Sequence, residues 1–264
     1  MTDANLAAWV TYDVYRHAEH SAVGDIRVLP NLYSPQLDNS RDVLVYLPPG
    51  HAAGQQRFPV LYMHDGQNLF DRGTAFGGNE WQVDETLETL SAEGLGAIVV
   101  GLPNAGEARV PEYSPFPGHG PARGDAYLAF IIDTVKPLID AVYCTQPERQ
   151  HTGILGSSMG GLISLYAFFR HPEVFGLAGG LSPSLWYTRG AIYNYVRQSP
   201  FVPGKLYIDN GTRENSAARL ERVLAEKGYQ PARDLMYVAE EGGRHSEIDW
   251  ARRLPNALRF LLGH

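Results

Sequence analysis

The chain has 264 residues, of which 44% are hydrophobic and 19% are charged, and its formal net charge is −7. This composition provides enough apolar side chains for a large core, and it excludes a disordered or collagen-like protein. The longest apolar runs are too short to span a membrane, and no run of Lys or Arg exceeds two residues, so neither a membrane nor a nucleic acid is expected as a partner.

The length and the N-terminal residues also predict how the chain is organised and where it acts. We expect a single domain over residues 1–264, with its core at about 24–262. The first sixteen residues contain no basic segment followed by an apolar stretch, so no signal peptide is expected and a cytoplasmic location is predicted. Cys144 is the only cysteine, which excludes a disulfide framework and a cysteine-based zinc site. We expect no metal and no cofactor.

The order of apolar runs predicts an α/β fold. Residues 24–32 and 41–47 are apolar runs that end in Pro-containing turns, as in a pair of antiparallel strands. Further along the chain, short apolar runs alternate with helical patterns. The predicted strands are 59–63, 97–102, 152–155, 177–181, 205–209 and 235–239, and the predicted helices are 81–91, 125–143, 159–171, 216–227 and 247–262. This alternation is typical of a mostly parallel central sheet with an antiparallel N-terminal edge and helices on both faces.

Two residues further define the long helix predicted at 125–143. Asp125 is a residue type that caps helix N-termini, and Pro137 predicts a kink. In a parallel sheet of this kind, ligands bind beyond the carboxyl ends of the strands. We therefore look for function in the loops that follow Met63, Leu155, Asp209 and Ala239.

The loop after residue 155 contains the sequence G-x-S-x-G, with Ser158 at its centre. A strand precedes it and a helix follows, which is the context of a nucleophile elbow. Glycines at positions 156 and 160 avoid collisions with the neighbouring strand and helix, and the helix N-terminus favours a developing negative charge. Ser158 is therefore the candidate nucleophile; the alternative is a glycine-rich packing turn.

A serine nucleophile needs a base, and in this fold the base is a histidine that follows the serine in the chain. Three histidines do so. His171 precedes any strand that could supply an acid, and His264 is the terminal residue. His245 lies in a glycine-containing loop after the last predicted strand, so it is the candidate base. The alternative is that His245 is an ordinary surface residue.

The acid that orients the base should follow a strand between the nucleophile and the base. Glu214 comes after a turn containing Gly211 and can reach the histidine, so it is the preferred acid. Asp209 is the runner-up, because it lies at the end of its strand. We expect the residue that is not the acid to hold the loop by hydrogen bonds to turn amides. Glu240 and Glu241 are further alternatives.

An oxyanion hole needs two hydrogen-bond donors, usually backbone N–H groups. We expect one from Met159, which follows the nucleophile, and one from Gln67, in the loop after the strand at 59–63. His64 and Asp65 could also be read as metal ligands. Adjacent side chains point apart in an extended chain, however, and no third ligand has suitable spacing.

These motifs together resemble a known family. The blocks at 61–70, 81–84, 100–104, 156–161 and 182–186, with His245, Glu247 and Trp250, are similar to the putative-esterase family of α/β-hydrolases, and the likeness runs from about residue 24 to residue 262. This family includes enterochelin, feruloyl and acetylxylan esterases, S-formylglutathione hydrolases and mycolyltransferases. The resemblance implies a metal-free serine esterase with Ser158 and His245 in the dyad positions. Family members commonly have Asp where this chain has Glu214, so the acid departs from the pattern.

The expected substrate is a small-molecule ester. The resemblance suggests that Arg109, Glu112 and Tyr113 border the pocket, and the aromatic residues near the predicted loops suggest its walls. The expected pocket walls are Phe70, Trp81, Tyr113, Trp186 and Tyr187.

Three alternatives to a general esterase remain open from the sequence. Four arginines in the site-side loops could bind an anionic siderophore ester; they are Arg109, Arg123, Arg213 and Arg244. The same acyl-enzyme could serve an acyltransferase. A binding protein without enzymatic activity is the third alternative.

Overall fold

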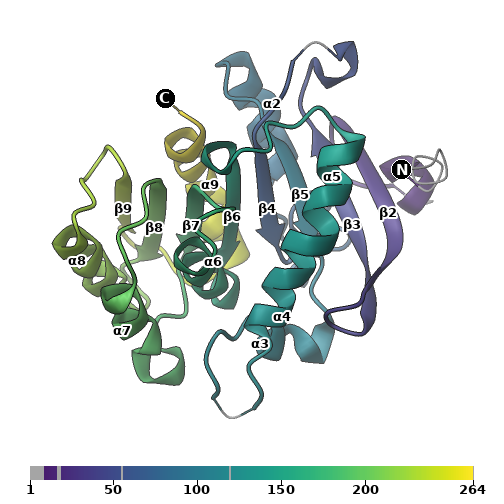
Figure 1. Cartoon of the computed structure of the whole chain (residues 1–264). Helices are drawn as coiled ribbons and strands as arrows, with labels where there is room; N and C mark the ends of the chain where they lie inside the picture. Colours follow the sequence, from purple (N-terminus) through teal and green to yellow (C-terminus); the bar gives the residue numbers. More distant parts are fainter. Residues whose placement is uncertain (1–8, 17–18, 55, 119, 264) are drawn as a thin grey trace.

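The computed structural model describes residues 9–16, 19–54, 56–118 and 120–263. Its strands form a nine-stranded sheet in the order β1-β2-β3-β5-β4-β6-β7-β8-β9 (Figure 1). The strands are β1 (Val10–Thr11), β2 (Asp25–Ser34), β3 (Asn39–Leu47), β4 (Val60–His64), β5 (Ile98–Leu102), β6 (Thr152–Ser157), β7 (Leu177–Leu181), β8 (Lys205–Gly211) and β9 (Leu235–Glu240). The helices are α1 (Tyr12–Arg16), α2 (Val83–Ala92), α3 (Arg109–Glu112), α4 (Gly124–Ala129), α5 (Lys136–Val142), α6 (Met159–Arg170), α7 (Ala191–Gln198), α8 (Ala218–Lys227) and α9 (Glu247–Leu262).

The strand directions divide the sheet into two parts. β1, β2, β3 and β5 pair antiparallel with one another in that order. All pairings from β5 through β4, β6, β7 and β8 to β9 are parallel. The prediction of a mostly parallel sheet with an antiparallel N-terminal edge is confirmed.

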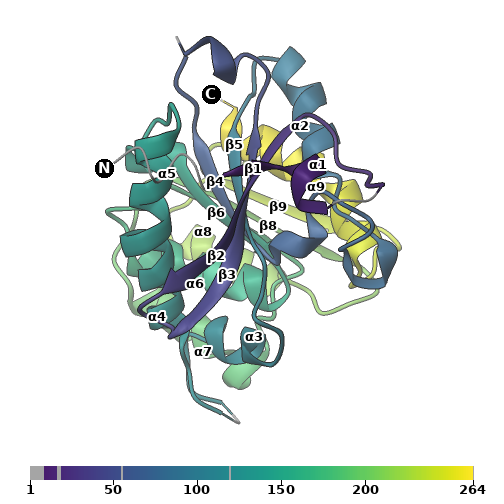
Figure 2. The ribbon, with the colours of Figure 1, turned by 90° about the vertical axis from the view of Figure 1, so that its right-hand side faces the viewer.

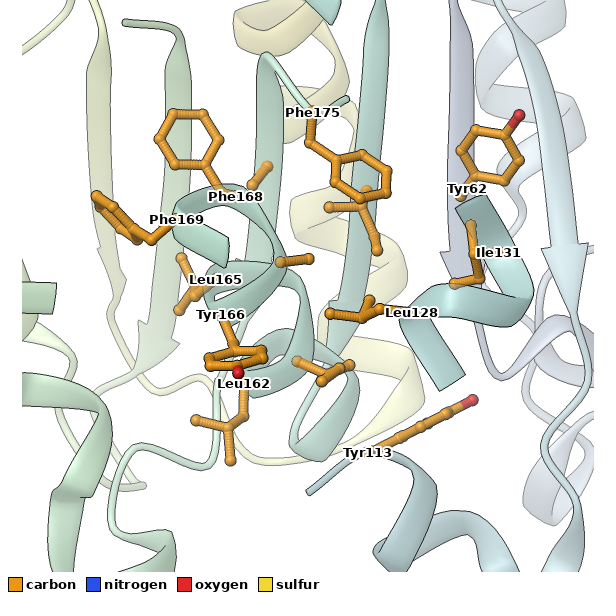
Figure 3. Packing of buried hydrophobic residues seen from close by; sticks show 14 of the residues in the cluster. Tyr62, Tyr113, Leu128, Ile131, Leu162, Leu165, Tyr166, Phe168, Phe169 and Phe175 are labelled. Carbon is orange, nitrogen blue, oxygen red and sulfur yellow. The ribbon is translucent and has the colours of Figure 1, made fainter. Parts of the chain in front are cut away.

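Helices cover both faces of the sheet, as predicted. Figure 2 shows α4, α5 and α6 on one side and α2 and α9 on the other. Side chains alternate along each strand, so Tyr62 of β4 lies in one hydrophobic cluster and its neighbours Leu61 and Met63 in the other. Figure 3 shows part of the cluster under α4 and α6, where Tyr62, Leu128 and Phe168 are buried. The two clusters fix the orientation of the strands from which the site is built.

The long helical region predicted at 125–143 differs from the structure in two details. The helix begins at Gly124, so Asp125 lies in its first turn and is not the N-cap. The carboxylate of Asp125 instead accepts a hydrogen bond from Tyr166. Pro137 follows a π-helical segment at Phe130–Val135. Proline lacks an N–H, and its ring crowds the carbonyl four residues earlier, so the irregular hydrogen bonding lies just before it.

The sequence analysis missed α7, which begins after Gly190 in a left-handed conformation. It also missed α3, in the long segment after β5, and the two short N-terminal elements, β1 and α1. All four are shorter than the windows in which a periodic pattern can be recognised.

The strand register brings the candidate site residues to one edge of the sheet. Ser157 of β6 is level with Leu181 of β7, and Leu181 is level with Asp209 of β8. The segments that follow these positions therefore emerge side by side. Among the described residues, no helix is both long and apolar enough to cross a membrane.

Candidate active site

Ser158 lies at a sharp turn between β6 and α6. Its backbone has φ 55° and ψ −119°, a region that side chains other than glycine rarely adopt. A Cβ on Gly156 would lie 2.8 Å from His64 Cδ2 and 2.9 Å from the backbone carbon of Gly160, so only glycine fits there. The N–H of Ser158 donates to the carbonyl of Leu181 at 3.0 Å, which fixes the turn against β7. This geometry has the form of a nucleophile elbow.

The hydroxyl of Ser158 lies 3.1 Å from the hydroxyl of Ser184, which is buried. The backbone of Ser184 is held in turn, because its N–H donates to the Ser158 carbonyl at 2.9 Å. Among the described residues, Ser158 Oγ makes no hydrogen bond to His245. The hydroxyl of the candidate nucleophile is therefore held by a neighbouring serine.

His245 makes a short hydrogen bond with Glu214. His245 Nδ1 lies 2.7 Å from Glu214 Oε2, and the histidine side chain is 43% exposed whereas the carboxylate is only 7% exposed. The edge of the His245 ring also packs against Trp250. The histidine is thus oriented from behind by a buried carboxylate, and its other nitrogen is left for chemistry.

The second oxygen of Glu214 is fully engaged. Glu214 Oε1 accepts hydrogen bonds from Ser182 Oγ at 2.6 Å and from the Gly211 N–H at 2.7 Å. Ser182 Oγ in turn accepts from Trp250 Nε1 at 2.9 Å and Arg253 Nη2 at 2.7 Å, both on α9. Burial alone would raise the pKa of Glu214, but the hydrogen bonds from His245, Ser182 and Gly211 outweigh it and lower the pKa below its ordinary value.

The loops that carry Glu214 and His245 pack backbone to backbone. A Cβ on Gly211 would lie 2.1 Å from the carbonyl group of Gly243, far inside the contact distance of non-bonded heavy atoms. The Arg213 N–H donates to the Gly243 carbonyl at 3.1 Å, which ties the two loops together. The absence of a side chain at Gly211 therefore permits the contact that brings Glu214 to His245.

Asp209, the runner-up acid, makes a different set of contacts. It is completely buried and pairs with Arg253 Nε at 3.1 Å. Its carboxylate accepts hydrogen bonds from the Ser182 N–H at 2.9 Å and the Tyr207 hydroxyl at 3.0 Å. Burial raises the pKa of Asp209 to about 6, and Arg253 acts in the opposite direction. These contacts hold the Ser182 turn and do not reach His245.

The loop after β4 is shaped by an ion pair. Asp65 has a left-handed backbone (φ 55°, ψ 47°), and its carboxylate accepts two hydrogen bonds from Arg109, both at 2.7 Å. The side-chain amide of Asn104 donates to the same carboxylate at 2.7 Å. In the described part of the chain, neither the Gln67 N–H nor the Met159 N–H donates to a protein acceptor. Of these two candidate oxyanion donors, Gln67 lines the cavity next to Ser158, whereas Met159 is buried and is not among its lining residues.

A cavity of about 370 Å³ lies next to Ser158 and His245. It includes four residues named from the sequence, which are Ser158, His245, Gln67 and Arg109. Its other lining residues, which the sequence analysis did not assign to the pocket, are Asp65, Asn68, Phe76, Asn104, Ser157, Glu247 and Trp250.

The expected aromatic wall of this cavity needs correction. Phe70, Trp81 and Tyr113 are at most 1% exposed and belong to the hydrophobic core, as Figure 3 shows for Tyr113. Trp186 and Tyr187 pack against each other and do not line the cavity. Aromatic side chains in loops next to a sheet gain more from burial between sheet and helices than from facing solvent, and sequence alone does not distinguish the two positions.

The cluster of arginines proposed from the sequence is also dispersed. Arg109 lines the cavity, but Arg123 donates to the Leu37 carbonyl, and Arg213 and Arg244 are exposed outside the lining. Glu112 is buried against Arg41. Of the alternative bases, His171 lies near Glu173, and His264 lies outside the described residues. Among the described residues, no group of three His, Cys, Asp or Glu side chains could hold a metal.

Comparison with known families decides the relationship. A sequence profile described as Putative esterase matches residues 34–261, which is most of the chain. The chain belongs to the Putative esterase family. As a member of the Putative esterase family it is a serine esterase, an enzyme that hydrolyses carboxylic esters.

Three proteins similar to the chain match different shares of it. The protein YbbA of Bacillus subtilis is 27% identical over 246 residues, which cover 85% of this chain and 93% of YbbA. A siderophore enterobactin esterase of Emericella nidulans is 34% identical over 130 residues, covering 46% of this chain and 41% of that protein. The crystal structure of the enterobactin esterase from Shigella flexneri superimposes with a TM-score of 0.71 at 20% identity, over 90% of this chain and 59% of that one. This chain thus spans only part of both enterobactin esterases.

Proposed function

We propose that the protein hydrolyses a small-molecule carboxylic ester through an acyl-enzyme on Ser158. His245 is the general base, Glu214 orients it, and the N–H groups of Met159 and Gln67 bind the oxyanion. The observation that carries this proposal is the 2.7 Å hydrogen bond between Glu214 and His245, made beside the cavity that also contains Ser158.

The mechanism follows from the position of these groups. Ser158 Oγ attacks the carbonyl carbon of the ester while its proton passes to His245 Nε2. The developing oxyanion takes hydrogen bonds from two N–H groups that have no protein acceptor, and the N-terminus of α6 adds a favourable dipole. His245 then gives the proton to the leaving alcohol. A water molecule, deprotonated by His245, attacks the acyl carbon and releases the acid.

The contact of Ser158 in the structure is compatible with this mechanism. Ser158 Oγ must leave Ser184 and turn to His245 before it can attack. Catalytic hydrogen bonds are often loose in the free enzyme and tighten when the substrate is bound. Ser158 and His245 line the same cavity. The movement that the proposal requires is a change of the serine side-chain rotamer toward His245.

A fluorophosphonate probe tests the proposal directly. The folded protein should be labelled on Ser158, as located by peptide mass spectrometry, and Ser158→Ala should abolish both the label and the hydrolysis of 4-nitrophenyl acetate. Ser164, a buried serine on the same helix, offers a matched control, because Ser164→Ala should retain the label. Folded protein that is not labelled would overturn the assignment.

A siderophore ester is the second candidate substrate, because two of the relatives are named for enterobactin. Only one arginine, Arg109, lines the described cavity, and its guanidinium is already paired with Asp65. Comparing enterobactin with neutral esters of simple alcohols as substrates distinguishes the two candidates. A higher kcat/KM for enterobactin would favour the siderophore ester.

A further inference from the structure

Glu247 lines the candidate active site, and its carboxylate has no hydrogen-bond or ion-pair partner among the described residues. It lines the same cavity as Ser158 and His245, at the first turn of α9. Its side chain accepts no hydrogen bond from any other described residue. Partial burial raises the pKa of Glu247 above its ordinary value, and Asp65 adds to this effect, whereas His245 and Arg109 oppose it. The mechanism proposed above leaves this group without a role.

Glu247 lies close to the place where the leaving alcohol of the ester is expected. His245, two residues earlier, is the residue that protonates the leaving alcohol, so the alcohol must lie next to it. Glu247 lines the same cavity as His245, so a leaving alcohol held there shares the cavity with Glu247.

We infer that Glu247 determines specificity for esters whose leaving alcohol carries a further hydroxyl group, which donates a hydrogen bond to the Glu247 carboxylate. This inference rests on the proposed function, since it assumes that an ester is cleaved at Ser158. An unpaired acceptor in a partly buried site favours substrates that supply a donor and disfavours those that leave it unsatisfied.

The charges around the cavity favour a neutral hydroxyl over an anion. An anion at this position would meet the carboxylate of Glu247, whereas the positive charge of Arg109 is already paired with Asp65. A hydroxyl can donate to Glu247 without this repulsion, and a cationic substrate is included in the test below to separate the two cases.

Two butyrate esters with matched leaving groups test the inference. Glycerol 1-monobutyrate and propyl butyrate share the acyl group and the three-carbon alcohol, and they differ only in the two additional hydroxyls. The measured quantity is the ratio of kcat/KM for the glycerol ester to that for the propyl ester. In Glu247→Ala this ratio should fall about tenfold or more, and in Glu247→Gln, which keeps a neutral acceptor, about threefold. Glu226→Gln, at an exposed residue of α8, controls for the loss of a charge and should keep the wild-type ratio.

The outcomes separate this inference from the proposed function. If wild-type protein is labelled by a fluorophosphonate on Ser158 but the ratio is the same in both Glu247 variants, the role of Glu247 is wrong and the esterase assignment stands. Labelling without hydrolysis of either ester would also overturn the inference. If Ser158 is not labelled, the proposed function fails and the inference fails with it. Butyrylcholine is the third substrate. If the Glu247 variants lose more kcat/KM on butyrylcholine than on the glycerol ester, Glu247 recognises a cation and the inference is overturned. The melting temperature of each variant shows whether it is folded. If Glu247→Ala does not fold, the test uses Glu247→Gln alone.

Discussion

Replacing Glu214 with Gln should remove the activity through the protonation of His245. The two oxygens of Glu214 have different surroundings: one accepts from Ser182 and Gly211, and the other faces His245. A glutamine must turn its carbonyl oxygen to the two donors, so its NH₂ group points at His245 Nδ1. That nitrogen then has to accept, and the proton of the neutral ring moves to Nε2. A ring protonated at Nε2 cannot take the proton of Ser158.

The size of the effect follows from the same argument. The equivalent change of tautomer costs about 10⁴ in kcat in serine proteases, or about 5 kcal/mol of transition-state stabilisation. We expect a loss of this order for Glu214→Gln with little change in KM. The assay is steady-state hydrolysis of 4-nitrophenyl acetate. The glutamine carbonyl oxygen still accepts hydrogen bonds from Ser182 and Gly211. The melting temperature of the variant should therefore stay close to that of the wild type.

Asp209→Asn provides the comparison that can refute this reasoning. It weakens the buried pair with Arg253, so we expect it to reduce the free energy of unfolding by about 3 kcal/mol. It leaves the contact between Glu214 and His245 in place, and kcat of the folded protein should fall by less than about tenfold. A collapse of kcat in Asp209→Asn, with Glu214→Gln still active, would identify Asp209 as the acid and show that the tautomer argument is wrong.

Three further predictions concern the resting nucleophile, the contact between the loops and a buried histidine. Ser184→Ala should speed fluorophosphonate labelling of Ser158 about fivefold, because it removes a competing hydrogen bond of about 1 kcal/mol; slower labelling would mean that Ser184 assists the reaction. Gly211→Ala should lower kcat/KM at least a hundredfold, because its Cβ collides with Gly243 and separates the acid from the base; near-normal activity would contradict the proposed contact. Burial lowers the pKa of His64 in the folded protein to about 3, from an ordinary value of 6.5, with Arg109 adding to the effect and Asp65 opposing it. The unfolded chain therefore binds a proton that the folded protein excludes, and stability should fall by about 2 kcal/mol between pH 7 and pH 5 in urea titrations. His64→Gln should remove this contribution, and an equal pH dependence in the variant would refute it.

Much of the fold could be predicted because its signals are local. Strands buried on both faces, such as β4 and β5, consist of short continuous apolar runs, and the long helix α9 has a clear amphipathic period. The start of α4 was misplaced by one residue, because Asp125 is used to contact α6 and not to cap its own helix. A helix boundary depends on such tertiary contacts as well as on local preference.

The candidate site was predictable only where the chemistry requires particular residue types in a particular order along the chain. Ser158 and His245 could be named because the elbow motif and the chain order limit the choice. The pocket could not, since it depends on which side of a loop faces the core. Phe70 and Phe76 show the difference: Phe70 is 1% exposed, whereas Phe76, six residues later in the same connection, is 74% exposed and lines the cavity.

The hydrogen bonds at Ser182 connect catalysis to the C-terminal end of the chain. Ser182 supports Glu214 and is itself held by Trp250 and Arg253, so the orientation of the acid depends on the docking of α9. Local opening of this helix would release the acid while the rest of the sheet stays folded. If α9 detaches on heating before the sheet unfolds, the midpoint for loss of activity will lie below the midpoint for global unfolding, and equal midpoints would show that α9 unfolds together with the sheet.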